Sequence, residues 1–160
     1  MVARFFLYLA VALVPLQPAD SADRTLKDIG SVSIAVEPIA PAVAALGVTD
    51  AALRDQVQRA LKGAGVPAAA APGGASMVVT INAVRIETTR RSTSGVAYTV
   101  TLSVEQGVTL ARTGDTARAS TWRRAGIGVA RPGQAAGAIR DQLKEYLDAF
   151  VSAWRAANSR

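Results

Sequence analysis

The chemistry open to this chain is limited by the residue types that it lacks. Its 160 residues include no Cys and no His. Without Cys the chain has no disulfide, no thiol nucleophile and no thiolate ligand for a metal. Without His it lacks the usual general base near neutral pH, the Ser-His-Asp triad and most zinc sites. We therefore expect no metal site and no cofactor.

The acidic residues fit a solvated surface better than a catalytic pair. Asp141, Glu145 and Asp148 stand three or four residues apart, so they lie on the surface of one predicted helix among basic neighbours. A hydrolase with two catalytic carboxylates needs them to converge on a cleft from different elements. This spacing does not predict such a cleft.

The remaining routes to catalysis are weak as well. A serine nucleophile would need a desolvated lysine as its base, and Lys27, Lys62 and Lys144 all occupy lead-in or exposed positions. Glu87 and Glu105 lie on adjacent predicted strands and could approach each other, although pairing with Arg85 or exposure to water is the simpler interpretation. We expect that the chain is not an enzyme.

Basic residues form the one constellation that suggests binding. Arg90 and Arg91 stand at the predicted tip of a hairpin. Arg118 and Arg124 stand on the last predicted strand, with Trp122 between them. Guanidinium groups bind phosphate and carboxylate well, and an arginine can stack on an exposed tryptophan. These five residues are our candidates for a site that binds an anion or a partner.

A purely structural role for the same arginines is also open. Arginines at strand edges and hairpin tips keep a sheet soluble and prevent its edges from pairing. The adjacent residues Arg123 and Arg124 point to opposite faces of a strand, so they cannot both join one patch. The sequence pattern does not place Trp122 on either face.

The first residues have the plan of a secretory signal peptide. Arg4 precedes an apolar run over residues 5–14, and the small residues Ala19 and Ser21 are spaced as cleavage requires. A membrane-spanning helix needs about 20 apolar residues, and this run is shorter. We predict a signal peptide over residues 1–21 and one domain without a transmembrane span over residues 22–160. Cleavage after Ala22, an uncleaved anchor and a buried helix are the alternatives.

Export changes the meaning of the charge. The formal net charge is +6, and it stays +6 without residues 1–21 because that segment holds one basic and one acidic residue. In the cytosol such a charge would suggest nucleic acid as a partner. The abundance of Ala and Arg fits a bacterial genome rich in GC. For a periplasmic or secreted bacterial protein we expect no nucleic acid, and instead an envelope protein, a lipid or an anionic surface.

The first elements that the patterns predict are a strand and a helix. Residues 31–37 alternate in polarity, which is typical of a half-buried strand, and Pro38 and Pro41 end it. Thr49 then has the features of a helix N-cap, and apolar residues recur at helical spacing up to Ala64. Gly65 is the stop signal.

Three strands and a long helix follow. Residues 76–87, 96–110 and 116–129 are the strands, and the second has one apolar and one polar face. Neither face of the third strand is consistently apolar or polar, which predicts a bulge near Arg123 and Arg124 or near Gly126. From Gln134 to Asn158 one apolar stripe predicts a helix about 35 Å long. Its stripe consists of Ile139, Leu143, Tyr146, Leu147, Phe150 and Trp154.

The order β-α-β-β-β-α predicts an α+β fold. Two amphipathic helices and one sheet with a single apolar face make a two-layer sandwich. The sheet is four-stranded and mostly antiparallel, with both helices on one face. The first strand, joined to the rest through a helix, can lie parallel to its neighbour.

With this order of elements the chain resembles small envelope proteins of the LptE type, which help to assemble the outer-membrane lipopolysaccharide translocon. The resemblance covers most of the chain after residue 21, and it concerns the topology, meaning the order of the strands and helices. Proteins of that type carry a lipidated N-terminal Cys, and this chain has none. N-terminal domains of the TolB type have related plans, so the resemblance supports the fold more than the function. The matching parts are the strand Ser31–Glu37, the helix Thr49–Ala64 ending at Gly65, the hairpin around Arg90 and Arg91, and the terminal helix.

Two functions of different classes are open. The first is a non-catalytic periplasmic module, in a setting such as outer-membrane assembly, that binds another envelope component through the free sheet face or a strand edge. The second is a carrier of a small ligand or lipid. In a carrier, an anionic head group would lie near the arginine-rich loops and an acyl chain between sheet and helices. The second function requires a hydrophobic cavity between the sheet and the helices. The presence or absence of this cavity therefore distinguishes the two functions.

Overall fold

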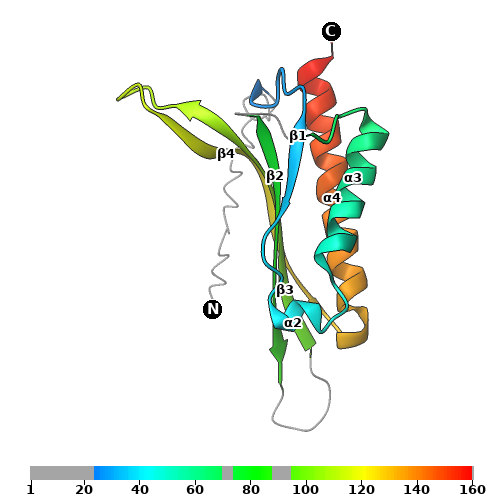
Figure 1. Cartoon of the computed structure of the whole chain (residues 1–160). Helices are drawn as coiled ribbons and strands as arrows, with labels where there is room; N and C mark the ends of the chain where they lie inside the picture. The colour runs from blue at the N-terminus through cyan, green and yellow to red at the C-terminus, as the bar shows by residue number, and fades with distance from the viewer. Residues whose placement is uncertain (1–23, 70–73, 88–94, 160) are drawn as a thin grey trace, which may run out of the picture.

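The computed structural model describes residues 24–69, 74–87 and 95–159 (Figure 1). The predicted signal peptide over residues 1–21 lies outside the described residues, as do Arg90 and Arg91. Among the described residues, no helix combines the length and the apolar character that crossing a membrane requires. The elements in chain order are β1 (Val32–Val36), α2 (Pro41–Ala44), α3 (Asp50–Ala64), β2 (Ala75–Ile86), β3 (Gly95–Thr109), β4 (Thr116–Ala130) and α4 (Pro132–Asn158).

The strands form one mixed sheet in the order β1-β2-β3-β4. β1 pairs with β2 in parallel, because α3 carries the chain back before β2 begins. The other two neighbouring pairs are antiparallel and joined as hairpins. The predicted α+β sandwich and its parallel first strand are therefore confirmed.

Both long helices cover the same face of the sheet, which we call the helix side (Figure 1). α3 contacts β1 and α4, and α4 also contacts β3 and β4. The predicted ends of α3 are confirmed: the Thr49 hydroxyl accepts a hydrogen bond from the N–H of Ala52 at 3.3 Å, and Gly65 has a φ of 77°. Such a left-handed backbone favours glycine. Local sequence signals therefore set the length of α3.

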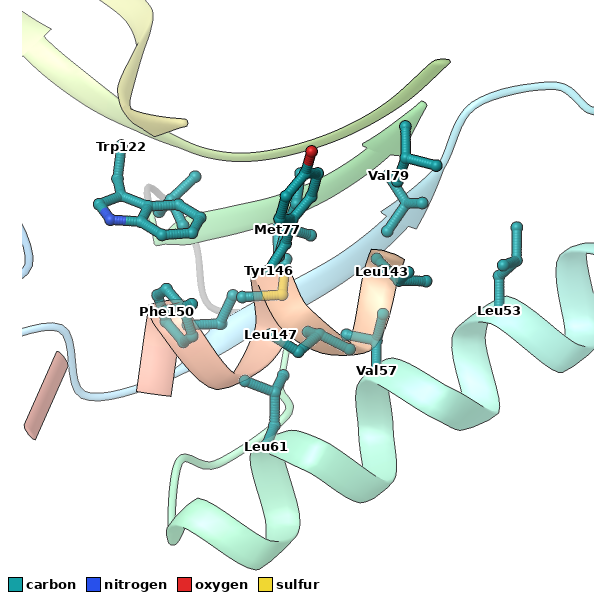
Figure 2. Close-up of a cluster of buried hydrophobic side chains, with 14 of the residues drawn as sticks. Leu53, Val57, Leu61, Met77, Val79, Trp122, Leu143, Tyr146, Leu147 and Phe150 are labelled. Atoms are coloured by element: carbon teal, nitrogen blue, oxygen red, sulfur yellow. The ribbon is translucent and has the colours of Figure 1, made fainter. Parts of the chain in front are cut away.

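The hydrophobic core fills the space between the sheet and the helices. Figure 2 shows side chains of α3 and α4 meeting those of β2 in this layer. The predicted stripe of α4 is buried from Ile139 to Phe150, and Trp154 is half-buried, with its Nε1 donating to the Ile29 carbonyl at 3.2 Å. Burying one large aliphatic side chain stabilises the fold by about 2 kcal/mol. The principal members from these three elements are Leu53, Val57, Leu61, Met77, Val79, Leu143, Leu147 and Phe150.

The irregularity of β4 is confirmed, close to one of the two predicted positions. The register between β3 and β4 shifts between Val104 and Glu105, whose partners are Trp122 and Ser120, so Thr121 is the extra residue. The bulge lies two residues before Arg123, near the first predicted position and not at Gly126. Beyond the shift, the ends of β3 and β4 project away from the helices (Figure 1).

Two further differences concern the sequence patterns around β1 and β2. Pro41 begins the short helix α2, which the sequence pattern does not predict, because proline also suits the first turn of a helix. Glu87 and Glu105 do not approach each other. Glu105 forms a pair with Ser76 at the start of β2, whereas Glu87 follows Ile86 at the other end of that strand.

Candidate functional site

Trp122 belongs to the core and not to the surface. It pairs with Val104, which faces the helix side, so the indole turns inward. The residue is 6% exposed, and its ring meets Phe150 of α4 edge to face with the centroids 5.5 Å apart (Figure 2). This corrects the expectation of an exposed tryptophan beside arginines. Its ring is not accessible to a ligand at the surface.

The described arginines of the predicted site do not form one cluster. Arg118 Nη2 donates to Ser76 Oγ at 3.0 Å, and Arg118 Nε lies 3.9 Å from Glu105 Oε2. Arg118 is therefore already engaged by β2 and β3. Arg124 is exposed on the helix side, opposite Leu102, whereas its neighbour Arg123 is exposed on the other face. The expected opposite orientation of these neighbours is confirmed.

The face of the sheet opposite the helices is the open face. Val100 and Leu102 of β3 are buried on the helix side, so Thr99 and Thr101 point to the open face. Their partners on β2 are Asn82 and Thr80. No described helix or strand lies over this face (Figure 1).

Large apolar side chains gather at one end of the open face. The register places Val84, Ala97 and Val129 in one row across β2, β3 and β4. A Cβ added to Gly95 would lie 3.7 Å from Ile86 Cδ1 and 3.7 Å from Val129 Cγ1, so these two side chains converge over Gly95. Four of the five exposed large hydrophobic residues in the described chain form this apolar patch, namely Val84 (68% exposed), Ile86 (39%), Ile127 (79%) and Val129 (67%).

The patch continues into a shallow hollow of about 510 Å³ in the middle of the open face. Thr80, Thr101 and Asn82 line it from β2 and β3, and Arg123 and Ile127 line it from β4. Hydroxyl, amide and guanidinium groups can bond to peptide or carboxylate oxygens. The residues that line the hollow include no acid and no lysine.

The two edges of the sheet differ. At the β1 edge, an Arg54 guanidinium nitrogen donates to the Ile34 carbonyl at 2.7 Å, and the N–H of Val32 donates to the Pro67 carbonyl at 3.0 Å. Side chains and loops therefore occupy this edge. Within the described chain, residues 125–130 of β4 have no hydrogen bond outside their ladder with β3. We call residues 125–130 the free edge.

On the helix side, the free edge carries two glycines and therefore has no side chains at these positions. A Cβ on Gly126 would overlap Tyr146 Oη, and a Cβ on Gly128 would overlap the ring of Tyr98. Both tyrosines are buried and lie directly against the backbone of β4. The free edge therefore has its helix side filled by aromatic rings, while Ile127 projects from the open face.

Sequence reasoning missed the apolar patch. Ile127 and Val129 alternate with Gly126 and Gly128, which is a signal for one apolar face. The pattern does not reveal that this face is turned away from the helices, because that depends on pairing with β3. It also does not reveal that Val84 lies in the same row.

One described ionisable group has a clearly shifted pKa. The Lys144 ammonium donates to Asp148 Oδ2 at 2.6 Å on the exposed side of α4, which confirms the predicted pair. The hydrogen bond from Asp148 and its negative charge raise the pKa of Lys144 above the usual value. The ammonium form of this lysine therefore persists to a higher pH than usual.

Comparison with known proteins gives distant likenesses in structure. One is to a minor lipoprotein from Acinetobacter baumannii, with 12% identity, a TM-score of 0.45, and coverage of 78% of this chain and 94% of that chain. Another is to the rare lipoprotein B from Shewanella oneidensis, with 12% identity, a TM-score of 0.37, and coverage of 79% and 94%. No family model and no curated protein matches the sequence. Likenesses at this distance assign neither an activity nor a partner to this chain.

Proposed function

We propose that the chain is an exported, non-catalytic module of the bacterial cell envelope that binds an envelope protein through the uncovered side of its sheet. The apolar patch on the open face carries the proposal. Apolar residues scattered singly on a surface are ordinary, but a group rimmed by polar residues is typical of an interaction surface. The plan shared with LptE-type proteins favours outer-membrane assembly as the setting.

The export part of the proposal rests on residues 1–21. Their charge, apolar run and small residues near Ser21 have the order that a signal peptidase recognises. An exported chain with a net charge of +6 meets acidic proteins and anionic lipids in the envelope. The same charge therefore supports an envelope partner.

The non-catalytic part rests on the available bases. The whole chain lacks His and Cys, so a Ser-Lys pair is the simplest remaining nucleophilic system, and its lysine needs a lowered pKa. The pKa of Lys144 is raised by Asp148. Lys27 and Lys62 are exposed to water, whereas the lysine of a Ser-Lys pair is desolvated. These positions support binding over catalysis.

The carrier alternative needs room for an acyl chain between the sheet and the helices. Several large side chains in this layer are at most 1% exposed, and they pack within one hydrophobic core (Figure 2). A lipid would have to displace them, at about 2–5 kcal/mol for each large side chain lost from the core. Binding on the open face needs no such rearrangement, so we favour it. These side chains include Leu53, Met77, Leu102, Leu143 and Phe150.

The test is affinity purification of the tagged protein from gently solubilised envelopes, followed by mass spectrometry. We expect a stoichiometric envelope protein with the wild type and its loss from the double variant Val84→Glu/Ile127→Glu. Both side chains are more than two thirds exposed, so the fold tolerates the change. The matched control is Ala51→Glu/Ala52→Glu, which adds the same charge at exposed positions of α3.

Two results would contradict the proposal. A double variant that keeps its partner while retaining the wild-type unfolding temperature would remove the open face from the binding surface. A wild-type protein that purifies without a protein partner but with bound lipid would favour the carrier function.

A further inference from the structure

We propose that the partner contributes an extended segment that adds to the sheet as a fifth strand, along residues 125–130 of β4. The inference rests on the proposed function and names the mode of binding. The occupant is a segment of a partner protein with alternating apolar residues and with acidic residues at both ends. Three independent features of β4 lead to this occupant.

The first feature is the unused hydrogen-bonding capacity of the free edge. In an antiparallel sheet, every second residue of an edge strand directs its N–H and C=O groups away from its neighbour. In the described chain, no hydrogen bond outside the ladder with β3 reaches residues 125–130. An added strand at the usual spacing of about 4.8 Å would bond to these groups. The β1 edge offers no such site, because Arg54 and Pro67 already occupy it.

The second feature is that the residues that prevent pairing with other chains are confined to the first part of β4. Arg118, Arg123 and Arg124 and the bulge at Thr121 lie in the first part of β4. Charges and bulges on edge strands are the devices that keep sheets from pairing with other chains. Residues 125–130 carry no charge and no proline. The unprotected stretch coincides with Ile127 and Val129 of the apolar patch.

The third feature is the charge at the two ends of the free edge. Arg123 and Arg124 precede it and Arg131 follows it, and all three are exposed. None of them has an acidic partner in the described chain. A segment with acidic residues at both ends would neutralise both groups of arginines.

The same charges disfavour a second copy of this chain as the occupant. Antiparallel self-pairing centred on Ile127 would set Arg123 of each copy opposite Arg131 of the other, and like charges directly opposite in a sheet are destabilising. Both copies would also carry a net charge of +6. A partner with acidic residues avoids both the opposed arginines and the repulsion between two positively charged chains.

The open face adds specificity to the pairing. Val84, Ala97 and Val129 form one apolar row, and a fifth strand beside β4 would extend it by one residue. Alternate side chains of the added segment would then contact Ile127 and Val129, while the remaining ones face the helix side near Gly128. Backbone bonds would supply affinity, and this row would select apolar residues at every second position.

The first test uses a synthetic peptide of alternating Val and Thr with glutamates at both ends, and measures amide hydrogen exchange in the purified protein. We expect exchange over residues 125–130 to slow by about tenfold, with no change over Val32–Val36. A peptide with the same centre and lysines at its ends should protect much less. Protection that is confined to β1, or is absent, would overturn the inference.

The second test separates the edge from the open face. Ile127→Glu and Val84→Glu place the same charge on the same face at similar exposure, but Val84 lies on β2, two strands inside the edge. At physiological salt a charge acts over about 8 Å, so a charge at Val84 acts only weakly on a strand that lies beside β4. Ala51→Glu, at an exposed position of α3 outside the proposed binding surface, is the neutral control. We expect Ile127→Glu to abolish the protection, Val84→Glu to weaken it much less, and Ala51→Glu to leave it unchanged.

The outcomes distinguish this inference from the proposed function. If Val84→Glu and Ile127→Glu each release the envelope partner to the same extent, the partner lies across the open face. The mode of binding is then wrong, and the proposed function stands. If the purified protein is a dimer that Ile127→Glu dissociates, the edge belongs to a second copy. If no envelope protein is captured by the wild type, the proposed function itself fails.

Discussion

At the scale of single residues, the close approach of tyrosines to β4 decides which residue types this strand can carry. Tyr98 and Tyr146 occupy the space that side chains at 128 and 126 would need. The two positions therefore require glycine because of steric contact and not because of an unusual backbone angle. Trp122, by contrast, is fixed by its pairing with Val104 and its contact with Phe150.

Gly128→Ala is expected to lower the free energy of unfolding by about 1–3 kcal/mol, because its Cβ would overlap the buried ring of Tyr98. The measurement is urea denaturation followed by circular dichroism. Gly107→Ala is the control within the same sheet, since its Cβ would meet only Thr116 Cγ2 at 4.0 Å. Equal losses in the two variants would show that strand glycines are replaceable irrespective of Tyr98.

Trp122→Ala is expected to lower the free energy of unfolding by about 3–5 kcal/mol, because it leaves a cavity against Phe150. Arg124→Ala should change it by less than about 0.5 kcal/mol, since that side chain is exposed. Thermal and urea unfolding of the two variants provide the comparison. If Trp122→Ala lowers the free energy of unfolding only slightly but abolishes partner binding, Trp122 belongs to the binding site.

At the scale of elements, β4 combines two different strands in one. Its first part carries arginines and the bulge, and its last six residues are uncharged and free at the edge. α3 is set by local signals at both ends, the Thr49 cap and Gly65. α4 instead depends on its packing, since no side chain caps its N-terminus and its stripe is buried over several turns.

Thr49→Ala is expected to destabilise the protein by about 1 kcal/mol, because the N–H of Ala52 loses its hydrogen-bond acceptor. Thr49→Ser keeps an acceptor in place and should retain most of the stability. The urea midpoint of each variant gives the comparison. An unchanged midpoint for Thr49→Ala would mean that water replaces the hydroxyl at no loss.

At the scale of the whole molecule, the fold has one layer of helices and one layer of sheet. No described helix or strand covers the open face (Figure 1). Both long helices lie on the helix side, and the core between the layers is filled (Figures 1 and 2). The surplus apolar surface therefore lies outside the fold, on the open face and along the edge of β4. This arrangement is compatible with the proposed binding of a partner to a domain that is already folded.

Native mass spectrometry of the wild-type protein, purified in mild detergent, is expected to show the protein mass without a lipid adduct. The physical reason is that the filled core leaves no space between the layers for an acyl chain. A stoichiometric lipid adduct that survives dilution would contradict the filled core and support the carrier function. Lipid extraction from the same sample is the control for weakly bound material.

The sequence alone determined the order of the strands and of the two long helices, and much of the core. The alternation of Val100, Leu102 and Val104 set the faces of β3, because successive side chains of a strand point to opposite sides. The stripe of α4 and the Thr49 cap were predictable for the same kind of reason, since helical spacing and capping act within one or two turns. These features depend on neighbours in the chain.

Only the tertiary structure decided the candidate site. The extra residue at Thr121 reverses the alternation of β4, so the face that Trp122 takes follows from pairing with β3 and not from its own strand. Val84 and Val129 are distant in sequence and become neighbours in one row only because both pair with Ala97. Register across strands and position at a sheet edge are properties of the assembled sheet, and no local pattern encodes them.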